Sequence, residues 1–377
     1  MNLLLAVEGV IRRNTDRSPD RVKHLLVLEY RLPLGCLVHM TPVFEMLKRS
    51  RPEINLTVAT CGLGLKVFRH SRFIDRLIDA PDPTTDLSAA VRGLRRQLRS
   101  HAIRPDCVLT GATDQRTRIA LMGMLGSTGW RGGYTLRPSL YHQPLEYDDG
   151  LSLIGNNLRL AKLVGCDAEV KEPTVFFSSA DAEAAEMMLR TAKPDGRPVV
   201  TMVTQTSGGQ RTGWHTERFV ELIRHVALEL GFAVVFVGTA ADAVAIDMIR
   251  MAAGGIGTSI AGRTSVSELA AVLALSDFVV APDTGTMHVG RAVGVPMVVL
   301  GPSWHKPLQW MPLGVKSVRL LRGEDRTDIP EGYRLDEIRT QDVIAALGEL
   351  VEAYPPSARA RKARELAGLS ETDHLQL

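Results

Sequence analysis

The sequence predicts an α/β protein of two domains, each with a parallel sheet covered by helices on both faces. Three observations favour this fold. The chain has 377 residues, and a typical size of about 150 residues per domain allows two domains. Short apolar runs alternate with patterns of helical period, as in β-α-β units. This alternation starts again after residues 171–181, which we interpret as a linker.

The first half of the chain begins with an amphipathic pattern at residues 1–13, where apolar positions recur three and four residues apart. We expect a helix there, which packs on the fold or rests on a membrane surface. Apolar runs and helical patterns then alternate. They predict strands at 24–29, 54–59, 73–79 and 106–109, and helices at 38–50 and 92–104.

The second half repeats this pattern with longer apolar runs. They predict strands at 198–203, 232–237, 278–281 and 296–300, and helices at 216–230, from 241, at 267–275 and at 288–293. A charged helix and a frayed end are expected at 357–377. The predicted boundaries are 1–172, 173–350 and 351–377, and we expect a cleft between the two sheets to bind ligands.

Composition excludes several classes of protein. Lys and Arg number 45 against 42 Asp and Glu, a balance that argues against nucleic acid as a partner. The four cysteines, at 36, 61, 107 and 166, form no C-x-x-C pair and no disulfide framework, which indicates a reducing compartment. No export signal or membrane-spanning segment is apparent, so we expect a cytoplasmic protein. No cluster of metal ligands stands out, and no metal is predicted.

The strongest local signal is the segment 281–288, APDTGTMH, between a predicted strand and a predicted helix. A helix start exposes unpaired N–H groups and a partial positive charge, and Gly285 lets an anion approach the backbone. The hydroxyl groups of Thr284 and Thr286 and the imidazole of His288 add further donors. A plain helix cap is the equal alternative, because Asp and Thr are favoured there.

The segment from Asp277 to Pro312 resembles the signature of glycosyltransferase family 9, the heptosyltransferases of bacterial surface-glycan assembly. That family shows D-T-G-x-x-H, G-x-P, F-G-P-like and W-x-P elements, which here are DTGTMH, GVP, LGP and WMP. Similar pieces occur upstream in the family's order. They lie at 25–42, 104–109, 131–134, 207–219 and 262–269.

The resemblance implies a GT-B fold, in which two Rossmann-like domains have parallel sheets facing across a cleft. It implies an inverting glycosyltransferase that transfers a sugar, heptose from ADP-heptose, in lipopolysaccharide biosynthesis, without a cofactor or a bound metal. The C-terminal domain would bind the nucleotide-sugar and the N-terminal domain a glycan, lipid-linked or other hydroxyl acceptor. A peripheral contact with the inner face of the cytoplasmic membrane is compatible with this. We assign the nucleotide-sugar site to Thr206, Ser207, Asp242, Thr264, Asp283, Thr284, Gly285, Thr286, Met287 and His288.

Two departures from the family pattern concern catalysis. The family has an Asp, its general base, directly after the first Gly of the first turn, where this chain has Cys36. His39, one helical turn later, is the nearest group suited to accept a proton near neutral pH, although a structural role is also open. The family's loop Lys falls on Thr212, and Arg211 beside it can neutralise the departing diphosphate. We therefore name His39, Cys36 and Arg211 as the candidate catalytic residues.

Two other functions and the role of one group of arginines have to be considered at this point. A catalytically impaired relative would bind nucleotide-sugar or a partner without transfer. A nucleotide-sugar epimerase is disfavoured, because no G-x-G-x-x-G comes after the first strand. The arginines of the stretch 92–104, together with Arg116 and Arg118, are either a solvated face or a contact for an anionic acceptor.

Overall fold

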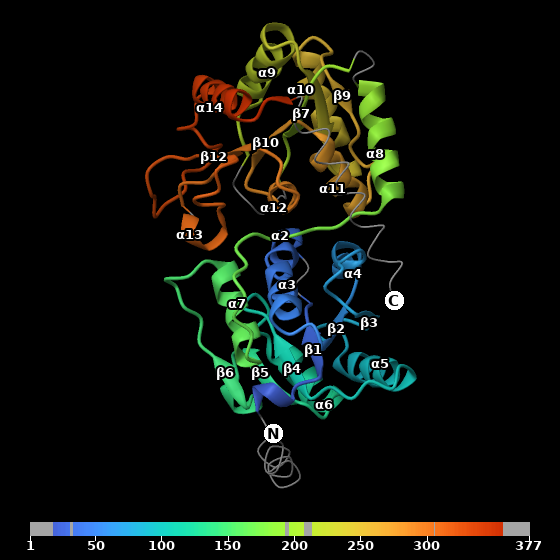
Figure 1. The fold of residues 1–377 in the computed structure, drawn as a ribbon. Helices are drawn as coiled ribbons and strands as arrows, with labels where there is room; N and C mark the ends of the chain where they lie inside the picture. The colour runs from blue at the N-terminus through green and yellow to red at the C-terminus, as the bar shows by residue number, and fades with distance from the viewer. Residues whose placement is uncertain (1–17, 31–32, 193–195, 207–212, 305, 357–377) are drawn as a thin grey trace. The chain divides into compact units, whose positions relative to one another are not determined.

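The computed structural model describes residues 18–30, 33–192, 196–206, 213–304 and 306–356. The chain divides into two compact units, Met1–Pro173 and Thr174–Leu377. Each unit contains one six-stranded sheet, and its strands pair in parallel (Figure 1). The predicted α/β fold with two parallel sheets is confirmed.

Unit 1 has the strand order β3-β2-β1-β4-β5-β6. Its strands are β1 (His24–Leu28), β2 (Asn55–Thr60), β3 (Arg76–Asp79), β4 (Cys107–Thr110), β5 (Trp130–Tyr134) and β6 (Gln143–Leu145). Its α-helices are α2 (Leu34–Val38), α3 (Thr41–Ser50), α4 (Leu63–Phe68), α5 (Leu87–Ser100), α6 (Thr117–Gly126) and α7 (Leu153–Leu163). Short 3₁₀ turns lie at Pro19–Arg21 and Pro138–Leu140.

Unit 2 has the strand order β12-β11-β10-β7-β8-β9. Its strands are β7 (Val199–Val203), β8 (Ala233–Val237), β9 (Thr258–Ser259), β10 (Phe278–Pro282), β11 (Met297–Leu300) and β12 (Val318–Leu321). Its α-helices are α8 (Ser179–Ala192), α9 (Thr216–Arg224), α10 (Ala243–Ala252), α11 (Val266–Leu275), α12 (Gly285–Ala292), α13 (Pro307–Trp310) and α14 (Thr340–Ala353).

Both sheets have the strand order of Rossmann-type domains. Counted within its own unit, each has the order 3-2-1-4-5-6. The order reverses between β1 and β4 in unit 1, and between β7 and β10 in unit 2. Ligands of such sheets bind outside the carboxyl ends of the strands at this reversal. The candidate site is therefore sought at the ends of these strands.

Matching aspartates set the register at the start of the central strands in both sheets. Asp106, just before β4, accepts hydrogen bonds from the amides of Lys23 and His24, each at 2.9 Å. Asp277, just before β10, accepts one from the amide of Val199 at 2.7 Å. Each carboxylate thus satisfies an amide that would otherwise be unpaired at the amino end of the neighbouring strand.

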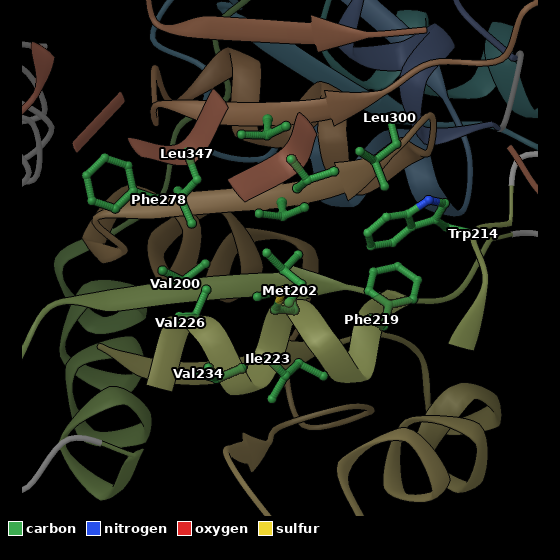
Figure 2. Close-up of a cluster of buried hydrophobic side chains, with 14 of the residues drawn as sticks. Val200, Met202, Trp214, Phe219, Ile223, Val226, Val234, Phe278, Leu300 and Leu347 are labelled. Atoms are coloured by element: carbon green, nitrogen blue, oxygen red, sulfur yellow. The ribbon is translucent and has the colours of Figure 1, made fainter. Parts of the chain in front are cut away.

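The core of unit 2 lies between its sheet and the helices α9 and α14. Val200, Met202, Phe278 and Leu300 come from the strands. Figure 2 shows Val200 and Met202 facing side chains of α9, and Phe278 beside Leu347 of α14. The Trp214 and Phe219 rings meet edge to face with centroids 4.9 Å apart, and the Trp214 indole donates to the Ile338 carbonyl at 2.9 Å. Continuous buried strands such as β7 and β10 explain why the apolar runs were readable in the sequence.

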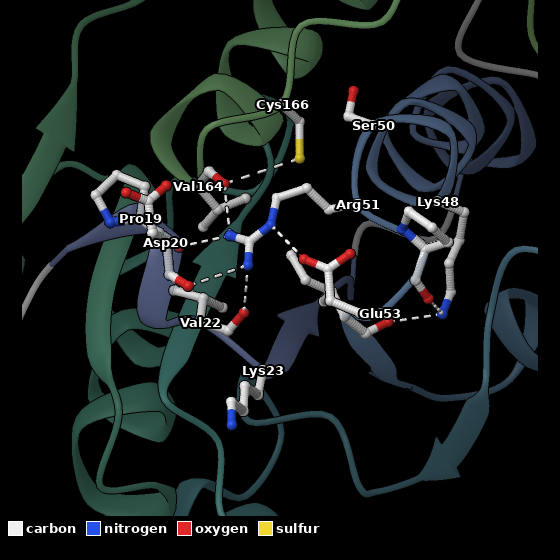
Figure 3. A network of polar contacts seen from close by, with 12 residues as sticks. Pro19, Asp20, Val22, Lys23, Lys48, Ser50, Arg51, Glu53, Val164 and Cys166 are labelled. Atoms are coloured by element: carbon white, nitrogen blue, oxygen red, sulfur yellow. Dashed lines mark hydrogen bonds and ion pairs between the residues drawn. The ribbon is translucent and has the colours of Figure 1, made fainter.

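In unit 1, Arg51 joins three parts of the chain after α3 (Figure 3). Its Nη1 donates to the carbonyls of Pro19 and Val164, and its Nη2 to those of Asp20 and Val22. Its Nε donates to Glu53 Oε1 at 2.8 Å. One guanidinium thus ties the segment before β1 to the end of α7.

Several predicted boundaries need correction. The helix expected at 38–50 begins at Thr41 as α3, with Pro42 in its first turn, where a missing N–H is tolerated. A separate short helix, α2, ends at Val38. The helix expected at 216–230 ends as α9 at Arg224 and continues as a π turn over His225–Glu229. The helix expected at 288–293 begins three residues earlier, at Gly285, because Thr284 is its N-cap.

The predicted domain boundary after residue 350 falls inside α14, whose Leu347 and Leu350 are part of the unit 2 core. The helix expected at 1–13 and the segment 357–377 lie outside the described residues. All four cysteines are described, and all are free thiols.

Candidate functional site at the carboxyl edge of the sheets

The turn between β10 and α12 carries the predicted anion site. The amide of Asp283 still donates to the Leu300 carbonyl of β11 at 3.2 Å, so this residue is fixed to the sheet. Thr284 has extended backbone, and its Oγ1 accepts from the Met287 amide at 3.4 Å. The amides of Gly285 and Thr286 lie at the helix start, where N–H groups have no intrahelical carbonyl to bond.

His288 lies in the first turn of α12 and is 4% exposed. Its Nε2 is 3.7 Å from Asp283 Oδ1. Burial lowers the pKa of His288 to about 4, because the loss of hydration outweighs the opposing effect of the Asp283 carboxylate. The imidazole is therefore neutral at physiological pH, with one N–H donor and one acceptor nitrogen. The Trp310 ring of α13 lies beside it, with centroids 6.3 Å apart.

Other predicted nucleotide-sugar residues share this edge of the sheet. Thr206 comes after β7, the strand next to β10, and is half-buried. The amide of Gly262 donates to the Gly238 carbonyl at 2.9 Å, which brings the segment before Thr264 beside the end of β8. Ser207 and Arg211, predicted from the loop after β7, lie outside the described residues, as does Thr212.

Asp242 has a structural role that the sequence did not indicate. Its Oδ2 accepts from the Thr239 amide and from Thr239 Oγ1, both at 2.7 Å, and so caps the turn before α10. This occupies one carboxylate oxygen. A contact from Asp242 to a ribose would have to use the other oxygen.

The predicted catalytic pair Cys36 and His39 lies on and directly after α2, beyond the carboxyl end of β1. Both side chains are buried, with exposures of 6% for Cys36 and 1% for His39. Asn157 of α7 donates to the His39 carbonyl at 3.1 Å and accepts from the Ala112 amide at 2.9 Å. This amide group therefore links the turn after α2 to the end of β4.

Sequence reasoning missed the role of Asp114 at the same edge of unit 1. Asp114 is 1% exposed, and its two oxygens accept from Arg116 Nε at 2.6 Å and Nη2 at 2.8 Å. Arg116 Nη2 also donates to the Tyr30 carbonyl at 3.2 Å. The segment T-D-Q-R could have indicated this pair, since an Asp two residues before an Arg can hold the guanidinium with both carboxylate oxygens.

The end of the basic helix α5 does not lie at the carboxyl edge of the unit 1 sheet. Arg76, the first residue of β3, has its Nη1 3.1 Å from Nδ1 of His101, directly after α5. The end of α5, with Arg99, is therefore at the amino edge of the sheet, away from the edge where Rossmann-type domains bind ligands. Arg118, from α6, donates to the Thr84 carbonyl at 2.6 Å.

Two features are absent from the described part of the chain. Within it, no group of three or more His, Cys, Asp or Glu side chains is arranged to hold a metal ion. In the same residues, no helix has the length and apolar character needed to cross a membrane.

Comparison with known protein families identifies the family of this chain. Residues 119–331, more than half of the chain, match glycosyltransferase family 9 (heptosyltransferase). The chain belongs to glycosyltransferase family 9. The resemblance predicted from the D-T-G-x-x-H segment is thereby confirmed.

Relatives of this family 9 chain are distant in sequence. Lipooligosaccharide heptosyltransferase 2 of Haemophilus influenzae is 27% identical over 202 residues, which are 49% of this chain and 57% of that protein. The chain thus spans little more than half the length of this curated relative in the match.

Two solved structures have the same GT-B fold over most of their length. The family 9 glycosyltransferase of Veillonella parvula has a TM-score of 0.78 and 19% identity, with 88% of this chain and 98% of that chain covered. The E. coli ADP-heptose lps heptosyltransferase II has a TM-score of 0.72 and 18% identity, with 88% and 99% covered. At these identities, the likeness concerns the fold alone.

Proposed function

We propose that this family 9 chain is a metal-independent glycosyltransferase that moves a heptosyl group from ADP-heptose to a hydroxyl group of a lipopolysaccharide-type acceptor. Family membership supports the reaction class. The name of the E. coli structure, an ADP-heptose lps heptosyltransferase, supports the donor and the acceptor class. We further propose inversion at the anomeric carbon, with the acceptor held by unit 1 on the cytoplasmic side of the membrane.

One observation carries this proposal: the start of α12 at the carboxyl edge of the unit 2 sheet. Gly285 leaves room for an anion at the backbone, and the amides there are suited to a diphosphate. The neutral His288 in the first turn can donate one hydrogen bond without bringing a fixed charge into a buried site. Together these groups stabilise a diphosphate without requiring a cation.

The chemistry uses that arrangement directly. The acceptor oxygen forms a bond to the anomeric carbon while the bond from that carbon to the diphosphate oxygen breaks, and ADP leaves. Negative charge grows on the departing diphosphate, where the helix amides and His288 stabilise it. Arg211, whose assignment is a sequence argument, would add a positive charge there. The acceptor's proton passes to a base in unit 1.

Calorimetric titration in the presence of EDTA tests the donor site. ADP should bind more tightly than GDP or UDP without any metal. His288→Ala should weaken ADP binding about 10- to 100-fold, which corresponds to the loss of a hydrogen bond to a charged oxygen. Asp283→Ala should weaken ADP binding less than His288→Ala, because the Asp283 carboxylate lies beside the His288 imidazole and affects the nucleotide only through it. The control is His225→Ala, in the π turn after α9.

Equal affinity of the wild type, Asp283→Ala and His288→Ala would remove the donor site from residues 283–288. A strict requirement for magnesium would also contradict the proposal, because the helix start is argued to replace the cation.

For the base, we propose His39 rather than Cys36. A thiol at its ordinary pKa is neutral at pH 7 and is a poor proton acceptor, whereas imidazole accepts protons near neutrality. Cys36→Ala should keep most of the transfer activity, and His39→Ala should lose about 100-fold in kcat, a usual contribution of a general base. ADP affinity depends on unit 2 and should stay unchanged in both variants. Because Cys36 and His39 lie in unit 1, urea unfolding of each variant, compared with the wild type, reports whether unit 1 is intact.

An inactive Cys36→Ala beside an active His39→Ala would identify the thiolate as the base instead. A wild type that is inert with every donor, but gains turnover as Cys36→Asp, would identify a relative that has lost its base. The second result is specific because a carboxylate at position 36 would lie in the first turn of α2, where a negative charge is favoured.

A further inference from the structure

The turn after β11 is held by a polar network from a distant part of the chain. Ser303, buried in this turn, donates its hydroxyl to Glu337 Oε1. Tyr333 donates its hydroxyl to the same oxygen at 2.6 Å. The two hydroxyl oxygens are 3.4 Å apart. One carboxylate oxygen therefore fixes two side chains that are 30 residues apart in the sequence.

The backbone of the turn is fixed from the same side. The amide of Arg326 donates to the Ser303 carbonyl at 2.9 Å, and Arg322 Nη2 donates to that carbonyl at 3.2 Å. The Arg326 guanidinium lies 5.6 Å from the centre of the Tyr333 ring, within the range of a cation–π contact. The segment 322–337 thus surrounds the turn with donors and one acceptor.

Glu337 has little freedom to adopt another position. A Cβ added at Gly323 would lie 2.4 Å from Glu337 Cγ, so only a glycine leaves room for this side chain. Glu337 Oε2 is buried, and no described residue donates a hydrogen bond to it. Burying an acceptor without a partner costs free energy. The orientation of the carboxylate is therefore set by Oε1, the oxygen that holds Ser303 and Tyr333.

The turn leads directly to the donor site. β11 pairs with β10, whose end carries Asp283 and the start of α12. From Ser303 the chain reaches α13, where the Trp310 ring lies 6.3 Å from the His288 ring, tilted by 57°. Ser303 is therefore the fixed point from which the chain leads to α13 and Trp310.

We propose that Glu337 is a positioning residue of the donor site: by holding Ser303 and Tyr333, it places Trp310 beside His288. This inference rests on the proposed function, because it takes His288 as a donor-binding group. Glu337 does not itself touch the donor. It acts through the turn at Ser303 and the aromatic ring further along the chain.

Three variants and one control test the role. Glu337→Ala removes the acceptor, Tyr333→Phe removes one donor, and Glu337→Gln keeps an acceptor oxygen in the same place. The control is Glu331→Ala, an exposed glutamate of the same segment. The readouts are ADP affinity, donor KM and kcat, and acrylamide quenching of Trp310, which is isolated by subtracting the emission of Trp310→Phe.

Glu337→Ala should weaken ADP binding and raise donor KM about tenfold, the effect of losing hydrogen bonds to a charged group, with kcat within about threefold. Quenching of Trp310 should increase in parallel. Tyr333→Phe should lie between Glu337→Ala and the wild type. Glu337→Gln should restore both ADP affinity and quenching, and Glu331→Ala should match the wild type.

Unchanged quenching and unchanged ADP affinity in Glu337→Ala would overturn the inference. So would a Glu337→Gln variant that fails to restore either readout, since this would show a general loss of packing. If wild-type protein binds no ADP, the proposed function fails. The quenching of Trp310 then still decides by itself whether Glu337 positions that ring.

Discussion

At the scale of single residues, His288 shows how burial fixes a protonation state. Its pKa is lowered to about 4, against about 6.5 in an unfolded chain. Between these two values the unfolded state binds more protons than the folded state, so stability rises with pH across that window. The contribution is fully present above pH 6.5 and is lost as the pH falls towards 4.

We therefore expect the wild type to lose about 3 kcal/mol of unfolding free energy between pH 6.5 and 4 through this residue, since each pKa unit is worth about 1.4 kcal/mol. His288→Gln should lack this component. Urea unfolding of both proteins at several pH values measures the difference, and His225→Gln is the matched control. Parallel curves for the wild type and His288→Gln would contradict the assignment.

Part of the candidate site could be predicted from the sequence for a simple reason. Asp283 and Thr284 come after an apolar run and precede a Gly, and such a pattern at a strand end points to the carboxyl edge of a parallel sheet. The neighbours of His288 could not be predicted. Trp310 comes from a segment 22 residues further along the chain, and Glu337, which holds the turn at Ser303, from one 49 residues further. The sequence pattern around residue 288 carries no signal for either.

At the scale of elements, Arg51 acts as a joint between the start of unit 1 and the end of α7. Arg51→Lys keeps the charge, but an ammonium group cannot reach four carbonyls and a carboxylate at once. We expect a loss of about 1–3 kcal/mol in unfolding free energy, measured by urea denaturation. Arg49→Lys, an exposed arginine two residues earlier, should change it by less than about 0.5 kcal/mol.

Equal destabilisation by Arg51→Lys and Arg49→Lys would show that the Arg51 contacts contribute nothing beyond those of a surface arginine. A greater loss of unfolding free energy in Arg51→Lys than in Arg49→Lys would support the role of Arg51 in joining these parts of unit 1.

Strands with a buried and continuous apolar run could be predicted most directly, and short or weakly patterned elements were missed. β8 and β10 are buried at every position and were read directly from the sequence. β9 has only Thr258 and Ser259 and carries no apolar signal. α8 buries only Ala185 and Leu189, so its pattern is too weak to mark a helix. Gly285 disfavours a helix by itself, and the N-cap bond of Thr284 overrides that preference.

At the scale of the whole molecule, the same sheet order occurs twice, and each copy begins its central strands with an aspartate cap. The two copies carry different side chains at the reversal of strand order. Unit 2 has a helix start rich in donors with a neutral histidine, which suits a diphosphate. Unit 1 has a buried thiol, a buried imidazole and an Arg116 guanidinium that is already paired with the Asp114 carboxylate.

This difference predicts where a nucleotide stabilises the chain. Ligand at 100 times its Kd should add about 2.7 kcal/mol to the part of the protein that binds it. Because each unit has its own sheet and its own buried core, we expect ADP in EDTA to slow amide hydrogen exchange about 100-fold in the strands of unit 2. The amides at the start of α12 should be protected as well. The strands β1 and β4 of unit 1 should be unaffected.

Mass spectrometry of peptides from the two units measures this directly, and His288→Ala at the same ADP concentration is the control that should lose most of the protection. Protection confined to the residues around Cys36, His39 and Asp114 would contradict the proposal, because it would place the nucleotide at the edge of the unit 1 sheet. Protection of unit 2 that appears only with magnesium would support the position of the nucleotide but not its metal-independent binding. The nucleotide would then bind where the fold predicts, but the helix start of α12 would not replace a cation.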